Sequence, residues 1–178
     1  MSNLAILDTE TTGLNPETDE LLEIAICDQF GNPILNSLVR PVNKTKWPEA
    51  QAIHGITPAD VASAPTLGEL APKIREAVAG RTIVIYNRKF DAPFLGSLLD
   101  GAEGIECAMI RWAEHNNEYR EKDGNLKWHK LTKAAEEAGH TWGKDEAHRA
   151  LADARATATV WAYLDGQQLK HNNKRQGA

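Results

Sequence analysis

Two acidic residues one position apart, Asp8 and Glu10, directly follow the apolar run 4–7. Because successive side chains of a strand point to opposite faces, both carboxylates lie on one face if the strand continues through them. Carboxylates crowded together repel one another, and their burial without a cation is costly. A hard, oxygen-seeking cation such as Mg²⁺ or Mn²⁺ removes that cost. The pair therefore predicts a divalent-metal site at the end of this strand.

Further along the chain, Asp91 follows Asn87 by four positions, and Asp153 follows His148 by five. Taken alone, Asp91 is equally well explained as a helix N-cap, because Pro93 follows it. A lone Asp153 or His148 is most simply a solvated surface residue. Five helical residues turn through about 140°, so His148 and Asp153 cannot share one face of a regular helix. We expect His148 at or before the start of the helix that carries Asp153.

Together these segments resemble the DnaQ-like exonucleases of the DEDDh type. The resemblance covers roughly residues 4–164, and its four motifs occur in the family's order. They are DTETTG at 8–13, IHGIT at 53–57, NRKFD at 87–91 and HRALAD at 148–153. Only the first would indicate function by itself, and the joint match is far more specific than any single motif.

The resemblance implies a metal-dependent 3′–5′ exonuclease that releases nucleoside 5′-monophosphates. It implies that Asp8, Glu10, Asp91 and Asp153 bind two divalent cations, either Mg²⁺ or Mn²⁺, around the scissile phosphate. It also implies that His148 is the general base that activates the attacking water. A histidine suits this task, because an unperturbed imidazole titrates near pH ~6.5 and is largely neutral at physiological pH.

The resemblance further implies contacts between the motif loops and the 3′-terminal nucleotide. Backbone amides and hydroxyls after the first strand would hold it, and the IHGIT loop would stack or wedge against its bases, as suits single strands. The residues expected to contact substrate are Thr9, Thr11, Thr12, Leu14, His54 and Asn87. An alternative for His54 is that it caps the short helix that follows it.

Several other side chains invite a functional interpretation. Glu23 either supports the metal site from outside or is a plain strand residue, and Trp47 stays open as a stacking residue. The other four tryptophans are expected in the core or in helix packing. They are Trp112, Trp128, Trp142 and Trp161. Cys27 and Cys107 form no metal-binding pattern, so we expect reduced interior thiols.

The elements that position these residues predict an α/β chain. Strands are expected at 4–7, 21–27, 34–39, 82–86 and 105–107. Helices are expected at 48–53, 58–61, 67–78, 90–99, around 112, at 131–138 and at 147–164. This order predicts a mixed central sheet flanked by helices, and the resemblance implies the RNase H-like fold. Residues 1–165 are expected to form the exonuclease domain, and 166–178 a polar, flexible tail.

Bulk properties exclude some classes of protein. The 178 residues carry 42% hydrophobic and 25% charged residues, which is typical of one globular domain. No signal peptide or membrane span is expected, and a cytoplasmic location is predicted. The net charge of −5 does not exclude nucleic acid, because clustered carboxylates bind phosphodiester through their metals.

The expected partner is the 3′ end of single-stranded nucleic acid, with DNA favoured over RNA. An RNA-trimming exonuclease of the same family and an inactive nucleic-acid-binding module are the alternatives. The five intact chemical residues argue against the inactive module. The sequence leaves open a homodimer and association with a polymerase in repair or proofreading. Tyr86 stands where many relatives carry a small residue or histidine, which leaves substrate preference open.

Overall fold

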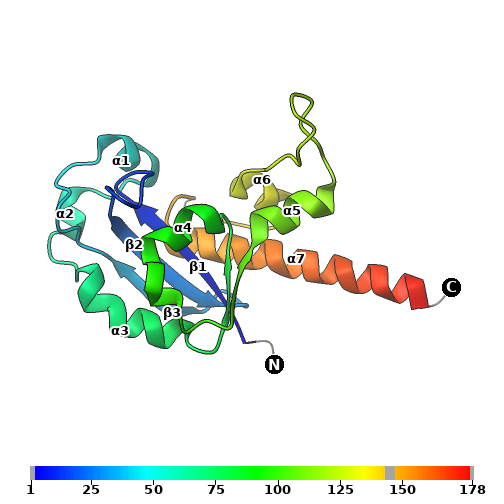
Figure 1. The fold of residues 1–178 in the computed structure, drawn as a ribbon, viewed down its shortest axis with the longest axis horizontal. Helices are drawn as coiled ribbons and strands as arrows, with labels where there is room; N and C mark the ends of the chain where they lie inside the picture. Colours follow the sequence, from blue (N-terminus) through cyan, green and yellow to red (C-terminus); the bar gives the residue numbers. More distant parts are fainter. Residues whose placement is uncertain (1–2, 143–146, 177–178) are drawn as a thin grey trace.

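A mixed five-stranded sheet forms the centre of the protein, seen in a computed structural model that describes residues 3–142 and 147–176 (Figure 1). The strand order is β3-β2-β1-β4-β5. The strands are β1 (Leu4–Thr11), β2 (Leu21–Asp28), β3 (Pro33–Leu38), β4 (Thr82–Ile85) and β5 (Gly104–Cys107). All five predicted strands are confirmed.

Strand β1 is the central strand and the point where strand direction changes. It pairs antiparallel with β2, which in turn pairs antiparallel with β3. On its other side β1 pairs parallel with β4, and β4 pairs parallel with β5. The carboxyl ends of β1, β4 and β5 therefore meet at one edge of the sheet, where open α/β sheets commonly bind ligands.

Helices cover both faces of the sheet, as Figure 1 shows. They are α1 (Pro48–His54), α2 (Pro58–Val61), α3 (Leu67–Val78), α4 (Arg88–Leu95), α5 (Ala108–Asn116), α6 (Leu131–Glu137) and α7 (Ala150–Gln176), with a 3-10 turn η1 (Gly96–Leu99). One core lies between the sheet and α3, where Leu7 packs with Ile74. The other lies beneath α5, α6 and α7, where Ile6 packs with Trp112. Burial on both faces explains why β2, β4 and the first half of β1 read as apolar runs.

Local hydrogen bonding sets where α3 begins. The hydroxyl of Thr66 accepts from the backbone N–H of Glu69, and the Glu69 carboxylate accepts from the N–H of Thr66. This capping box satisfies two backbone donors that the first turn of a helix leaves free. The helix start predicted at residue 67 is confirmed.

Two predictions about helices are corrected. Asp91 is not an N-cap, because α4 begins at Arg88 with Asn87 at the cap and Asp91 buried inside the helix. Helix α7 does not end at Leu164 but runs to Gln176. The flexible tail at 166–178 stays a prediction.

The tryptophan predictions are partly wrong. Trp112 is buried as expected, but Trp128 is 54% exposed. Trp47, which the sequence left open as a stacking residue, is only 4% exposed and donates from Nε1 to the carbonyl of Ile56 at 2.8 Å. Trp47 is therefore a packing residue. Cys27 and Cys107 are buried free thiols, as predicted.

None of the helices in the described part of the chain has the length and apolar character that crossing a lipid bilayer requires.

Candidate active site

The carboxyl end of β1 carries the first two acidic residues. Asp8 is 9% exposed, and Glu10 is partly buried two positions later in the same strand. Since β1 continues to Thr11, the period of two places both carboxylates on one face, as the sequence predicts. Glu10 stands opposite Glu23 of β2, so a third carboxylate shares this face.

Helix α7 brings Asp153 to these residues. Carboxylate oxygens of Asp8, Glu10 and Asp153 all lie within 4.8 Å of one another. His148 precedes the first residue of α7 by two positions, which agrees with the argument from helix rotation. Its backbone N–H donates to both oxygens of Asp153 at 3.3 Å, so the turn before α7 and the acidic cluster are connected directly.

Asp91 reaches the same edge of the sheet from α4. It is 4% exposed, and its Oδ1 accepts a hydrogen bond of 2.7 Å from the hydroxyl of Thr9. The charges of Asp91, Asp153 and Glu10 all raise the pKa of Asp8. Asp91 thus belongs electrostatically to the cluster, although it is not one of the three residues whose oxygens converge most tightly.

Burial dominates the electrostatics of these carboxylates. It is the main cause that raises the pKa of Asp8 well above its ordinary value and that of Glu10 to about 8. Burial also raises the pKa of Asp91 to about 7 and that of Asp153 to about 6. Without a cation, the protein therefore holds protons at this site that free carboxylates would release. Such a site favours any divalent cation that can replace those protons.

Glu23 connects the sheet to the start of α7. Its carboxylate accepts two hydrogen bonds from the Arg149 guanidinium, at 3.0 and 2.7 Å, and a third from the backbone N–H of Ala150 at 3.0 Å. Glu23 is 4% exposed. Because Arg149 follows His148 and α7 carries Asp153, Glu23 positions both the candidate base and a candidate metal ligand. Of the two interpretations open from the sequence, the supporting role fits the contacts.

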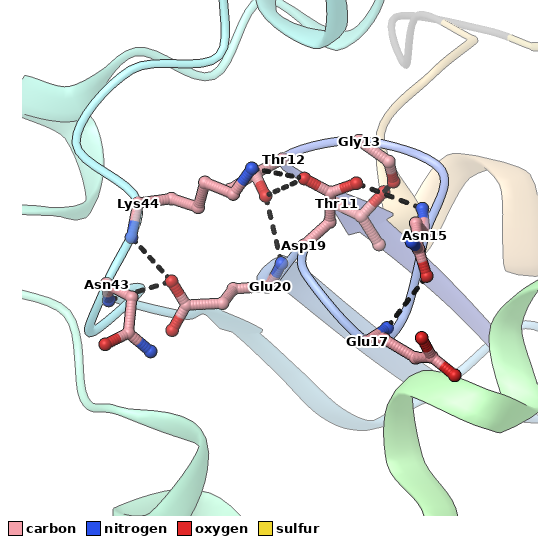
Figure 2. Close-up of polar contacts among 9 residues, drawn as sticks. All are labelled: Thr11, Thr12, Gly13, Asn15, Glu17, Asp19, Glu20, Asn43 and Lys44. Carbon is pink, nitrogen blue, oxygen red and sulfur yellow. Dashed lines mark hydrogen bonds and ion pairs between the residues drawn. The ribbon is translucent and has the colours of Figure 1, made fainter.

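The loop after β1 is held against the segment before α1 by Glu20, as Figure 2 shows. The Glu20 carboxylate accepts from three consecutive backbone N–H groups, those of residues 42, 43 and 44, at 2.7, 2.8 and 2.6 Å. Lys44 also forms an ion pair of 2.9 Å with Asp19. These contacts fix the two sides of a cleft relative to each other.

Gly13 is the one position of the DTETTG motif where a side chain would not fit. A Cβ at this residue would lie 2.5 Å from Oδ2 of Asp19. The same Asp19 oxygen accepts from the backbone N–H of Asn15 at 3.0 Å (Figure 2). The glycine therefore permits the close approach that closes the loop.

The cleft between this loop and α1 has a volume of about 570 Å³. Glu10 lines it together with the apolar side chains of Leu14, Ile53 and Phe90. Leu14 is 82% exposed and Ile53 is 62% exposed. Large apolar side chains that face solvent beside an acidic cluster indicate a binding surface.

His54 is buried, and both of its ring nitrogens are hydrogen-bonded within the protein. Its side chain is 6% exposed, and its Nδ1 accepts a hydrogen bond of 3.0 Å from the N–H of Ile56. Because Nδ1 is an acceptor, Nε2 carries the proton and donates to the carbonyl of Thr11 at 3.2 Å. Burial lowers the pKa of His54, which agrees with a neutral ring. Its surface is too small for base stacking, and α2 is capped by Thr57 instead. His54 joins α1 to the end of β1.

The threonine hydroxyls are also engaged within the protein. Thr9 donates to the carboxylate described above, Thr11 donates to the carbonyl of Gly13 at 2.6 Å, and Thr12 donates to Asp19 at 3.3 Å. All three threonines are buried. Contacts to substrate through these hydroxyls are therefore not favoured. The expected contact between Asn87 and substrate stays compatible with the structure. Asn87 occupies the N-cap of α4, but its side chain forms no cap hydrogen bond.

Comparison with known protein families identifies the family to which this chain belongs. A family model described as exonuclease matches residues 5–161. The chain belongs to the DnaQ-like exonuclease family. The uncharacterized exonuclease CP81 of Escherichia phage 186 is similar to this chain, with 39% identity over 166 residues that cover 86% of this chain and 84% of the phage protein. The predicted family membership is confirmed.

Similar sequences also occur within longer proteins. A DNA polymerase III subunit epsilon-like protein of Rhodobacter capsulatus is 30% identical over 171 residues, which cover 89% of this chain but 23% of that protein. This chain therefore spans less than a quarter of that relative.

Solved structures confirm the RNase H-like fold. Exonuclease X in complex with 5′ overhanging duplex DNA has a TM-score of 0.68 and 26% identity, with 92% of each chain covered. Exonuclease I of E. coli in complex with a dA16 oligonucleotide has a TM-score of 0.69 and 22% identity, with 92% of this chain and 40% of that chain covered. The second likeness supports the fold alone.

Proposed function

We propose that the protein is a divalent-metal-dependent exonuclease that removes nucleotides from the 3′ end of single-stranded DNA and releases nucleoside 5′-monophosphates. The observation that carries this proposal is the convergence of Asp8, Glu10 and Asp153 within 4.8 Å of one another. An apolar cleft begins at Glu10, beside this cluster. Membership of an exonuclease family supports phosphodiester hydrolysis at such a site.

The donor set fits hard divalent cations. Carboxylate oxygens are the ligands that Mg²⁺ and Mn²⁺ prefer, and buried carboxylates with raised pKa values gain most from a cation. Asp8, Glu10 and Asp153 would hold such ions, with Asp91 as a fourth ligand. When bound, two ions would supply activation of the attacking water and stabilisation of the departing 3′ oxygen.

The side chains of the protein provide the remaining steps. His148, exposed in the turn before α7, takes a proton from water as the water oxygen bonds to phosphorus. The bond between phosphorus and the 3′ oxygen breaks, and that oxygen leaves on the shortened strand and gains a proton. Thr9 keeps Asp91 in one orientation through its hydroxyl. The terminal nucleotide departs with the phosphate on its 5′ carbon.

The cleft lined by Leu14 and Ile53 is the proposed site for the 3′-terminal nucleotide. Its volume of about 570 Å³ is ordinary for a small-ligand site, where values of about 300–1,000 Å³ are typical. Apolar contacts to a base are tolerant of sequence and need an unpaired nucleotide. These contacts favour single strands, and the DNA complex of exonuclease X supports DNA as the substrate.

The experiment that tests the proposal is degradation of a 5′-labelled single-stranded DNA, with Mg²⁺ or Mn²⁺ and with chelator. We expect a ladder that shortens from the 3′ end and disappears with chelator. A circular single strand should resist, which separates exonuclease from endonuclease activity, and an RNA of the same sequence should be cut more slowly. No cleavage of the linear strands with either metal would contradict an enzymatic function and favour a nucleic-acid-binding module.

Replacement of Glu23 tests the connection between β2 and α7. Glu23→Gln keeps the shape of the side chain but removes the charge that Arg149 and Ala150 contact. Since a displacement of ~1 Å can cost on the order of 10²-fold in rate, we expect kcat to fall by about 10- to 100-fold with KM little changed. Steady-state kinetics on the DNA strand would measure both constants.

The matched control is Asp165→Asn, which removes an exposed partner of Arg111 on the same helix, α7. This control should leave kcat unchanged. Thermal unfolding of all three proteins would show how much stability each substitution costs. If Glu23→Gln lowers only the unfolding temperature and leaves kcat intact, Glu23 has a structural role alone.

A further inference from the structure

A second cleft approaches the acidic cluster from the side of α5 and α6. It has a volume of about 500 Å³, and His148 and Asp153 line it together with Asn87 and Trp128. The cleft at α1 is lined instead by Glu10 and Phe90. In Figure 1, α1 and α6 stand on either side of α4 and the end of β1. The candidate ligands therefore lie between two clefts.

Trp128 is the large exposed aromatic residue of this second cleft. Its side chain is 54% exposed, against the expectation of a core residue. Exposure of an indole to solvent is unfavourable by the hydrophobic effect. A large apolar side chain that is exposed beside candidate catalytic groups therefore indicates a binding surface. The flat face of an indole is suited to a nucleobase, because every base presents a π-face.

The backbone next to Trp128 is firmly held. His129 is 5% exposed, and its carbonyl accepts a hydrogen bond of 2.8 Å from the hydroxyl of Tyr86. Tyr86 is 6% exposed at the end of β4, one position before Asn87. The tyrosine that departs from the family pattern thus anchors the segment that presents Trp128. A platform whose backbone is anchored next to the indole loses less conformational entropy when a ligand stacks on it than an unanchored loop would.

A cation lies over the same ring. The Nζ of Lys89 is 5.8 Å from the centroid of the Trp128 ring, and Lys89 precedes Asp91 by two positions on α4. Among the side chains of residues 3–142 and 147–166, Lys89 forms no ion pair with a carboxylate. An ammonium beside an exposed indole presents a donor for phosphate next to a surface for a base.

We propose that Trp128 and Lys89 form a subsite for the nucleotide on the 5′ side of the scissile phosphate. Its base stacks on Trp128, and Lys89 contacts the phosphate backbone. This inference rests on the proposed function, which assigns the 3′-terminal nucleotide to the cleft lined by Leu14 and Ile53. A strand with its terminal nucleotide there and its scissile phosphate at the carboxylates continues into the cleft at Trp128.

The test removes each half of the proposed stack separately. One DNA strand is intact, and its partner carries an abasic residue at the second position from the 3′ end. Both are cleaved by the parent protein and by Trp128→Ala, and release of the terminal nucleotide is measured. On the intact strand, Trp128→Ala should lower kcat/KM by about 5- to 150-fold, the range of one base–aromatic stack. On the abasic strand the two proteins should differ by less than about twofold.

Three further variants complete the comparison. Trp128→Phe should retain most of the activity because it keeps an aromatic face, and Phe30→Ala should match the parent because it removes a 79% exposed aromatic on the turn between β2 and β3. Lys89→Met should weaken binding of both strands equally and reduce its salt dependence. Equal losses on both strands for Trp128→Ala, or no loss on the intact strand, would overturn the subsite.

Binding separates failure of the subsite from failure of the proposed function. Fluorescence anisotropy of a labelled single strand, measured in Ca²⁺, needs no cleavage. A parent protein that cuts neither strand would contradict the exonuclease function, yet Trp128→Ala should still bind the intact strand more weakly by a similar factor. Equal affinities of the parent and Trp128→Ala for the intact strand would overturn the subsite in that case as well.

Discussion

Replacement of Asp8 by asparagine should abolish cleavage and at the same time stabilise the metal-free protein. Asp8 is 9% exposed and lies among the charges of Asp91, Asp153 and Glu10, which raise its pKa. Asparagine keeps the shape but weakens the affinity for a hard cation. Metal stabilisation of several kcal/mol, at ~1.36 kcal/mol per tenfold in rate, predicts a loss on the order of 10³-fold or more.

The stability half of this prediction follows from proton linkage. The folded-state pKa values are about 8 for Glu10, about 7 for Asp91 and about 6 for Asp153, all above the ordinary values. The folded protein thus binds more protons than the unfolded chain between about pH 4 and pH 8. Its stabilisation by these groups is complete at acidic pH and is lost as pH rises through 6 to 8.

Thermal unfolding in chelator would measure this effect. We expect the unfolding temperature of the parent to fall from pH 5.5 to pH 8.5 and to recover on addition of Mg²⁺ or Mn²⁺. Asp8→Asn should unfold at a higher temperature than the parent at the upper pH, by ~2–4 °C for each kcal/mol of relieved repulsion, and should respond weakly to metal. Asp28→Asn, at the far end of β2, is the control. A parent protein that is insensitive to pH and metal would contradict the metal site.

Local physics accounts for the parts of the site that the sequence predicts. The strand period alone places Asp8 and Glu10 on one face, and the rotation of a helix alone places His148 before α7. Both arguments need only neighbours in sequence. The capping box at Thr66 and Glu69 belongs to the same class, because its partners are three residues apart. Such features depend on local geometry once the strand or helix has formed.

Tertiary packing decides the residues that the sequence left open or misplaced. Glu23 accepts hydrogen bonds from Arg149, which is 126 positions away in the sequence, and no local pattern indicates that pair. His54 looks like an exposed loop residue, but its ring bonds the backbone of Thr11, 43 positions away. Trp128 differs in the opposite direction. We expected it to be buried, because an aromatic residue before a helix normally packs inward, but it is exposed. Trp128 is 54% exposed, while the carbonyl of the adjacent His129 is bonded to Tyr86, 43 positions away.

The sequence placed the end of α7 too early for a different reason. The polar residues after Asp165 suggested a tail, but polarity does not end a helix. Gly166 costs only about 1 kcal/mol relative to alanine, and the glutamines and lysines that follow are good helix formers. No proline interrupts the segment. The hydrophobic pattern stops near Leu164, whereas the backbone hydrogen bonds continue to Gln176.

Removal of the His148 imidazole should lower kcat by about 10²- to 10⁴-fold, the usual contribution of a general base. His148 has a φ of 70°, in the left-handed region where most side chains are disfavoured. Its N–H is bonded to Asp153, and the next two residues are bonded to Glu23. These contacts hold the strained backbone and present the ring beside the carboxylates.

Glycine is the informative replacement, because it adopts this φ without strain and leaves room for a small molecule. His148→Gly should bind the DNA strand with nearly unchanged KM and retain the stabilisation of the fold by Mg²⁺, since no proposed metal ligand is altered. Imidazole added to the solution should restore part of the lost kcat, in proportion to its neutral form. His115→Gly, on α5, controls for the loss of an exposed histidine. A decrease in kcat below about tenfold would show that another group accepts the proton, because even weak general-base catalysis contributes about 10²-fold.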